Sequence, residues 1–339
     1  MLSTMRLRRR VLAVAGFLEI VGILAGPMLT AQIAEPKYPQ KTGVQTPGVQ
    51  HEMAELQPVA TFPVEGRPDW VTVTLDAVWV ASSNLNHVVR LDPKTNRPGA
   101  IVTIAEPCAG MAEGFGSLWI PSCGDHTVVR LDAETGMIQV KVAASPADDE
   151  GGIAVGAGSV WIVTSKDGDL VRIDPATNNV TAHVRIPAGS FNPVFANGSL
   201  WISSNANNTL VRVDPATNKV TGEIPVGPKP RFLTVGEGSV WVLNQGDGTI
   251  TRVDASTGKR TATIRAGIPG DGGEISFGAG AVWATVIGYP ITRIAPETNA
   301  VVGQWRGNGG DSICVGHGSL WLTDLKGAKV WRLPVANNH

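Results

Sequence analysis

The chain has 339 residues, of which 43% are hydrophobic, 17% charged and 6% aromatic. The low charged fraction excludes a disordered polyelectrolyte, and a net charge of −1 gives no basis for binding nucleic acid or acidic lipid. The 40 glycines and 23 prolines are typical of many short strands joined by turns.

The N-terminal segment has the features of an export signal. Four arginines between positions 6 and 10 precede an apolar run over residues 11–26, and small residues follow. We therefore predict that residues 1–34 are a secretory signal peptide, with an uncleaved membrane anchor as the alternative. Cleavage would leave a periplasmic or secreted chain without a membrane span. Residues 35–56 are polar, and their proline, glycine and glutamine content predicts a flexible leader.

A repeat with a period near 40 residues organises the rest of the chain. Most copies contain a glycine turn that leads into a tryptophan, as in GEGSVW, and an arginine follows ten or eleven residues later. A turn such as VDPATN comes next, so each copy holds four short β-runs. The repeated tryptophans are Trp79, Trp119, Trp161, Trp201, Trp241, Trp283 and Trp321.

Seven copies of a four-stranded unit predict an all-β fold, a seven-bladed β-propeller over residues 57–335. The last copy has only three strands, whereas residues 57–64 resemble the outer strand of a middle copy. We predict that this N-terminal strand pairs into the last blade and closes the ring, which removes exposed strand edges. The tryptophans should pack between blades, and the arginine stems should cover blade faces.

The GxGSVW and VxRxDPxT motifs resemble those of the YVTN-repeat and streptogramin-lyase-like family of secreted bacterial seven-bladed propellers. The resemblance covers roughly residues 57–335 and implies the fold. It also implies that a lyase would use His and Glu with Mg²⁺ at the channel mouth, the His following the proline of a blade junction. None of the seven matching positions is a histidine, so lyase activity is not carried over. These positions are Asp69, Ala109, Gly151, Phe191, Arg231, Gly273 and Asp311.

Functional residues are expected where the repeat is broken, at the innermost strands around the channel mouth. Extending the register of the glycine turns predicts which residues face each other across the first two strands of each blade. The predicted pairs are Asp69/Ser82, Cys108/Cys123, Glu150/Ser165, Phe191/Ser204, Arg231/Asn244, Glu274/Thr285 and Asp311/Asp324. The predicted binding residues at this mouth are Asp69, Glu150, Phe191, Arg231, Asn244, Glu274, Asp311 and Asp324.

Two pairs carry specific chemistry. Cys108 and Cys123 face each other within disulfide reach, and an export signal places them in an oxidising compartment. A disulfide is therefore predicted, with two buried thiols or a redox-active pair as alternatives. Cys314 is left over and is expected to be a small buried apolar residue.

The second pair, Asp311 and Asp324, places two carboxylates opposite each other, with Asp69 on the next blade around the ring. A divalent cation would relieve their repulsion, and oxygen ligands suit Ca²⁺ or Mg²⁺. The alternative is a solvated acidic funnel that Arg231 or other cations in the loops neutralise.

The chain shows none of the usual catalytic motifs, so its leading interpretation is a non-enzymatic exported propeller. It would act as a monomer that binds a small molecule or a protein partner at the channel mouth. The alternative is an enzyme, a metal-dependent lactone hydrolase or a streptogramin-lyase-like protein that uses the acidic mouth residues. A third interpretation is a redox-linked periplasmic component that uses Cys108 and Cys123.

Overall fold

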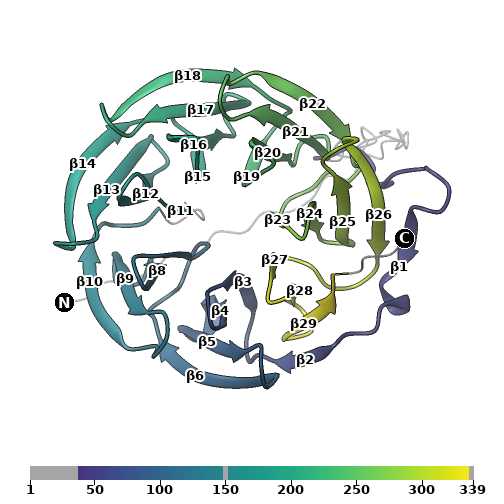
Figure 1. The fold of residues 1–339 in the computed structure, drawn as a ribbon, viewed down its shortest axis with the longest axis horizontal. Helices are drawn as coiled ribbons and strands as arrows, with labels where there is room; N and C mark the ends of the chain where they lie inside the picture. Colours follow the sequence, from purple (N-terminus) through teal and green to yellow (C-terminus); the bar gives the residue numbers. More distant parts are fainter. Residues whose placement is uncertain (1–36, 148–151, 336–339) are drawn as a thin grey trace, which may run out of the picture. The chain divides into compact units, whose positions relative to one another are not determined.

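The computed structural model describes residues 37–147 and 152–335, and the predicted signal peptide lies outside these ranges. Seven sheets are arranged in a ring, one after another along the chain (Figure 1). The predicted seven-bladed propeller is therefore confirmed. Apart from strands, the described residues contain two short 3₁₀ helices, η1 (Met53–Glu55) and η2 (Ser83–Leu85). No helix among them is long and apolar enough to cross a membrane.

The strands of each blade follow each other from the channel to the outer edge. Blade one consists of β3 (Pro68–Val73), β4 (Val78–Ser82), β5 (His87–Asp92) and β6 (Arg97–Thr103). Blade two consists of β7 (Ala112–Gly114), β8 (Ser117–Ser122), β9 (Thr127–Asp132) and β10 (Ile138–Ala143). Blade three consists of β11 (Ile153–Gly156), β12 (Ser159–Ser165), β13 (Asp169–Asp174) and β14 (Asn179–Arg185). Blade four consists of β15 (Ser190–Ala196), β16 (Ser199–Ser204), β17 (Thr209–Asp214) and β18 (Lys219–Pro225).

The last three blades follow the same plan with two additions. Blade five consists of β19 (Pro230–Gly236), β20 (Ser239–Asn244), β21 (Thr249–Asp254) and β22 (Arg260–Arg265). Blade six consists of β23 (Glu274–Gly278), β24 (Ala281–Val286), β25 (Tyr289–Ala295) and β26 (Ala300–Arg306), with β1 (Gln50–Glu52) as a fifth strand. Blade seven consists of β27 (Ile313–Gly316), β28 (Ser319–Asp324) and β29 (Lys329–Pro334), completed by β2 (Ala60–Pro63).

The N-terminal strand closes the ring as predicted. β2 pairs antiparallel with β29 and becomes the outer strand of blade seven. Backbone hydrogen bonds extend this pairing at both ends, from Val59 to Arg332 at 2.8 Å and from Val64 to Ala328 at 3.0 Å. Blade seven is thus built from both ends of the domain.

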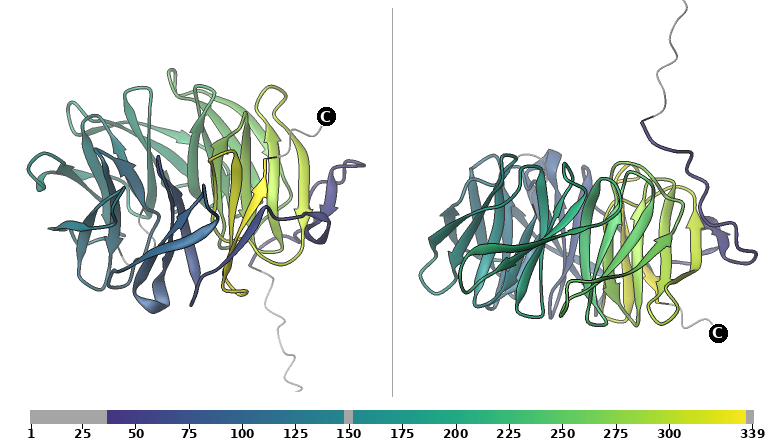
Figure 2. Two further views of the ribbon diagram at one scale, coloured as in Figure 1. Left: turned by 60° about the horizontal axis from the view of Figure 1, so that its bottom comes forward. Right: turned by 90° about the horizontal axis from the view of Figure 1, so that it is seen from above.

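The leader over residues 35–56 was predicted to be flexible, and this prediction is wrong for its described part. Residues 50–52 form β1, which pairs parallel with β26 on the outer edge of blade six. Figure 2 shows the segment lying against this edge of the ring. The polar groups of the leader form hydrogen bonds to blade six. Composition alone does not show whether polar groups bond to protein or to water.

The repeated tryptophans form the packing layers between blades. Six of the seven are at most 1% exposed, and Trp283 is 3% exposed. In six blades the indole nitrogen donates a hydrogen bond to the carbonyl five residues earlier, as from Trp119 to Gly114 at 3.1 Å. These six side chains are therefore buried without leaving their one polar atom unpaired, whereas the buried indole nitrogen of Trp79 in blade one has no hydrogen-bond partner among the described residues.

The repeated arginines do more than cover blade faces, because several of them fasten one blade to the next. The Arg172 guanidinium stacks on Trp161 at 4.9 Å and donates to the Pro215 carbonyl and the Asn218 side chain in the next blade. We call this contact the arginine latch. The four latches join Arg130 to Asn178, Arg172 to Asn218, Arg252 to Asn299 and Arg332 to Asn96.

Whether a seam has a latch depends on the last residue of the turn between the third and fourth strands of the next blade, which we call the receiving turn. The turns that Arg90 and Arg212 would reach end in Gly136 and Gly258 instead of asparagine, so those seams lack the acceptor. In blade seven the third and fourth strands come from opposite ends of the sequence, so no such turn joins them. The seam between blades six and seven is therefore built differently from the latched seams.

The latch predicts a difference between two matched substitutions. Arg172→Lys removes the guanidinium that spans two blades, whereas Arg212→Lys removes only a bond to Ser199 and stacking on Trp201. We expect Arg172→Lys to lower the free energy of unfolding by about 1–2 kcal/mol more than Arg212→Lys, because charge-assisted bonds are lost. Urea unfolding of both variants measures this, and equal losses would contradict the latch.

A second prediction concerns the turns that carry Asp254 and its equivalents. Hydrogen bonds from the Ser256 hydroxyl and the Thr257 amide lower the pKa of Asp254 to about 2, from 3.8. A depressed pKa contributes stability above pH 3.8, and this contribution disappears as the pH falls towards 2. Asp254→Asn should therefore melt below the wild-type protein at neutral pH, and the gap should close at pH 2. A gap that stays constant with pH would refute this assignment.

Candidate functional site at the junction face

The loops between blades lie on one face of the ring, together with the loops between the second and third strands of each blade. We call this the junction face; it carries the predicted channel mouth. The innermost strands of blades one, four and five are irregular there. The predicted register is wrong by one residue in these blades and confirmed for Glu274/Thr285. The observed pairs are Pro68/Ser82, Ser190/Ser204 and Pro230/Asn244.

The irregular strands fill the channel below the mouth. Trp70 of blade one and Phe232 of blade five come from opposite sides of the ring (Figure 1), and their ring centroids are 6.2 Å apart. Each residue is 5% exposed, and both belong to one apolar cluster with Met111 and Ile275. A ligand at the mouth therefore meets an apolar floor, not an open acidic well.

The predicted acidic residues on blades six and seven hold blades together. The Glu274 carboxylate accepts hydrogen bonds from the Ser312 hydroxyl and from the Ile313 amide at 3.2 Å. The Ser312 hydroxyl in turn accepts a bond from the Val71 amide at 2.9 Å. Glu274 thus belongs to a chain of contacts that crosses blades six, seven and one.

The remaining mouth residues also have local partners. The Arg231 guanidinium lies 3.9 Å from the ring centroid of Phe191. Asn244 is fully buried, and its amide donates to two threonine hydroxyls of β21. Asp69 is half-buried and lies 3.5 Å from the Ser83 hydroxyl. The predicted residue Glu150 lies outside the described residues.

The three aspartates predicted to hold a cation have separate surroundings. An Asp311 oxygen lies 3.5 Å from the Gly273 amide nitrogen, whereas Asp324 accepts from the Gly327 amide at 2.9 Å. Asp324 also lies 3.5 Å from the Lys329 ammonium group. Within residues 37–147 and 152–335, no three His, Cys, Asp or Glu side chains are gathered as a metal site. The described residues therefore do not fit the Ca²⁺ or Mg²⁺ site predicted at Asp69, Asp311 and Asp324.

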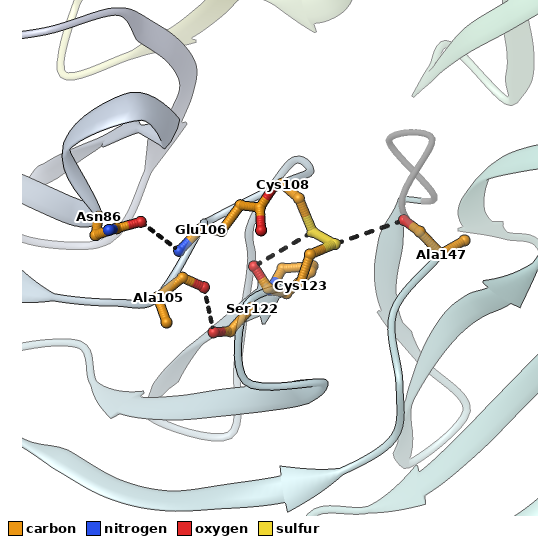
Figure 3. Close-up of a disulfide and its surroundings, with 8 residues drawn as sticks. Asn86, Ala105, Glu106, Cys108, Ser122, Cys123 and Ala147 are labelled. Atoms are coloured by element: carbon orange, nitrogen blue, oxygen red, sulfur yellow. Dashed lines mark hydrogen bonds between the residues drawn. A yellow bond between two sulfur atoms is a disulfide. The ribbon is translucent and has the colours of Figure 1, made fainter. Parts of the chain in front are cut away.

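Cys108 and Cys123 form the predicted disulfide at the junction face of blade two (Figure 3). Innermost strand β7 has only three residues, and the loop before it meets β8 through the bridge Pro107/Ser122. The disulfide adds a covalent link at this point, next to the Ala147 carbonyl, which lies 3.7 Å from the Cys123 sulfur. It therefore anchors the junction loop where the strand ladder is short.

The third cysteine is chemically separate from the disulfide. Burial raises the pKa of the Cys314 thiol to about 11, and the Glu274 charge adds to the shift. The thiolate that would attack a disulfide is therefore scarce at neutral pH.

Removing the disulfide should destabilise the fold measurably. The bridge closes a loop with a sequence separation of 15, for which the chain-entropy model gives about 3 kcal/mol. We expect the Cys108→Ala, Cys123→Ala double variant to lose up to that amount in urea unfolding, and reductant should destabilise only the wild-type protein. An unchanged unfolding midpoint would show that the bridge contributes no stability.

The junction face is hollowed between blades six and seven. One hollow of about 420 Å³ is lined by the loop over residues 307–310, by Ile287 and by the end of β28 at Asp324. A second hollow of about 470 Å³ shares Gly307, Asn308 and Asp324 with the first and continues along β29 to Trp331. We call the two together the seam cleft.

Local sequence explains why this space is open. The junction loop reads GNGG over residues 307–310, so few side chains fill it. Gly309 has φ +97°, and a Cβ atom there would lie 2.3 Å from the Trp331 ring, so only glycine lets the loop lie flat on the indole. The turn between β24 and β25 is also short, with Ile287 and Gly288 between the paired residues.

Both hollows of the seam cleft combine apolar and charged side chains. Met53, Leu56, Trp331 and Leu333 line the outer hollow beside Glu52, Arg306 and Lys329, whereas Ile287, Asp324, Lys326 and the glycine loop line the inner hollow. The Lys329 ammonium group lies 4.8 Å from the Trp331 ring centroid and neighbours Asp324. Of the predicted site residues, only Asp324 lines this cleft. Two features of the sequence correspond to the seam cleft: the GNGG run over residues 307–310 and the incomplete seventh repeat.

Comparisons with known proteins agree with the geometry. A family model described as outer membrane protein assembly factor BamB matches residues 124–221. No curated protein sequence matches the chain. Solved structures share the fold, at identities too low to carry function.

A streptogramin B lyase matches with a TM-score of 0.68 and 20% identity, covering 80% of this chain and 96% of its own. A catalytically inactive virginiamycin B lyase from Staphylococcus aureus with quinupristin matches with a TM-score of 0.71 and 18% identity, and the match covers 83% of this chain and 99% of the lyase chain. Kuenenia stuttgartiensis hydrazine synthase matches with a TM-score of 0.68 and 12% identity, and the match covers 87% of this chain and 99% of the synthase chain. The likeness is one of fold.

Proposed function

We propose that this protein is an exported binding propeller that takes a small amphipathic molecule in the seam cleft. The observation that carries the proposal is the continuity of the two hollows, because it brings the Trp331 indole and its apolar neighbours into one site with charged side chains and the glycine loop. Ligand sites are typically mainly apolar concavities with a few placed polar groups. The Trp331 side would take an aromatic or aliphatic part, and the polar group would lie towards Lys326 and the glycine loop.

This proposal moves the binding position from the channel axis to the seam. The axis is filled by Trp70 and Phe232, and the mouth residues Glu274 and Arg231 contact their own neighbours. Asp324 keeps a role at the seam, where it orients Lys329 above the indole. Lys326 and Lys329 favour a ligand whose polar end is anionic.

Export is part of the proposal. The basic and apolar pattern of residues 1–34 supports a signal peptide, and the Cys108–Cys123 disulfide is compatible with an oxidising compartment. We also propose that the exported protein acts as a monomer, as the sequence analysis predicts.

An enzyme of the lactonase or lyase type is the alternative, supported by fold likeness to the streptogramin lyases. None of the positions that match the lyase histidines carries a histidine in this chain. A shared scaffold does not transfer activity. The binding function therefore ranks first.

Binding of 8-anilinonaphthalene-1-sulfonate tests the site, because this probe combines aromatic rings with an anion. We expect the folded protein to bind it and Trp331→Ala to weaken binding at least about tenfold, since the aromatic floor is lost. Phe115→Ala is the control, because it removes an exposed aromatic from the opposite face. Fluorescence titration gives both affinities. Equal affinity for wild type and Trp331→Ala, or no binding to wild type, would refute the proposal.

A further inference from the structure

The leader forms one wall of the seam cleft. Glu52, Met53, Ala54, Leu56 and Pro58 all line its outer hollow. Met53 and Leu56 pack against the apolar cluster between blades six and seven, which also contains Trp305 and Trp331. The cleft is complete only when this segment lies on blade six.

One buried side chain holds the leader in place. Gln304 of β26 is fully buried, and its side-chain oxygen accepts a hydrogen bond from the Val44 amide at 2.8 Å. Its side-chain nitrogen donates to the Ala266 carbonyl at 3.0 Å and to the Thr292 hydroxyl at 3.1 Å. The Gln304 backbone amide also donates to the Val49 carbonyl at 2.8 Å. Gln304 therefore joins the leader to two blades.

The corresponding position elsewhere in the ring shows what is special about blade six. Glu223 of β18 pairs with Val211 just as Gln304 pairs with Thr292, and Glu223 is exposed. No added strand covers blade four. The buried glutamine is thus explained by the leader and not by the repeat.

Contacts at both ends of the leader strengthen this attachment. At one end, the Tyr38 hydroxyl donates to Asp271, and the Lys229 ammonium lies 4.3 Å from the Tyr38 ring centroid. Lys41 donates to the carbonyl of Ile287, a residue that lines the cleft. At the other end, Glu52 pairs with Arg306 and His51 stacks on Trp305 with centroids 5.3 Å apart.

We propose that docking of the leader, residues 38–56, controls the seam cleft, so that ligand binding and leader docking stabilise each other. This inference rests on the proposed function, because it names the regulation of that same site. The coupling follows from linkage: a ligand that contacts a wall binds more tightly when the wall is present, and it holds the wall in place to the same extent. The free leader would leave Trp305 and Trp331 without their cover.

Two variants of the full chain release the leader by different routes. Gln304→Ala removes the central anchor. Gly43→Ala places a Cβ atom 2.3 Å from the Gln304 side-chain oxygen, at a residue with φ +64°. Gly43 lies outside the blade strands, so this variant keeps the test valid if Gln304→Ala fails to fold. Glu223→Ala is the matched control at the equivalent exposed position.

Hydrogen exchange at residues 50–52 reports docking, and titration with 8-anilinonaphthalene-1-sulfonate reports the cleft. We expect both leader variants to exchange faster at these residues and to bind the probe at least about tenfold more weakly, with Glu223→Ala unchanged. Saturating probe should slow exchange at residues 50–52 in the wild-type protein.

Faster exchange with unchanged, Trp331-dependent probe affinity would overturn the coupling and leave the proposed function intact. Exchange at residues 50–52 that does not respond to saturating probe would also overturn it. Probe binding that does not depend on Trp331 would instead overturn the proposed function.

Discussion

Antiparallel pairing between β2 and β29 is the contact on which the ring depends. Without it, blade seven would lack its outer strand and the seven sheets would form an open arc with an exposed edge. Because the closing strand comes from the N-terminal end, the preceding residues must approach the ring near blades six and seven. Pairing of β1 with β26 and the contacts of Gln304 then hold the leader on blade six.

The seams between blades are not equivalent, although the repeats are similar. Four seams carry an arginine latch, and its presence follows from an asparagine in the receiving turn. At the seam between blades six and seven the chain itself crosses from β1 to β2, with Met53 and Leu56 packed between the blades. A seam joined by a chain segment has a surface that other seams lack, and both hollows of the seam cleft lie there.

The polar groups around the axis and those at the seam have different surroundings. Around the axis, Trp70 and Phe232 bury apolar area, and Glu274 and Ser312 connect neighbouring blades. These contacts stabilise the inner ring and use the polar groups that the mouth would need for a ligand. At the seam, glycines leave space beside an indole, and Lys326 is exposed. Because of this contrast, we propose the binding site at the seam and not at the axis, where the sequence had predicted it.

The sequence by itself determined the number of blades and the disulfide, because these follow from contacts within one repeat. It also determined the closing strand, although that strand pairs across the whole domain, because the last copy lacks one strand of the repeat and residues 57–64 match it. The spacing of the tryptophans sets the blades, and the missing strand of the last copy locates its replacement. Only the tertiary structure decided the one-residue shifts at the mouth, the filled axis, the bound leader and the seam cleft. Trp70 and Phe232, like Val44 and Gln304, are far apart in the chain and meet only when the ring closes. Such contacts depend on where the closed ring brings separate segments together, and no local pattern encodes that position.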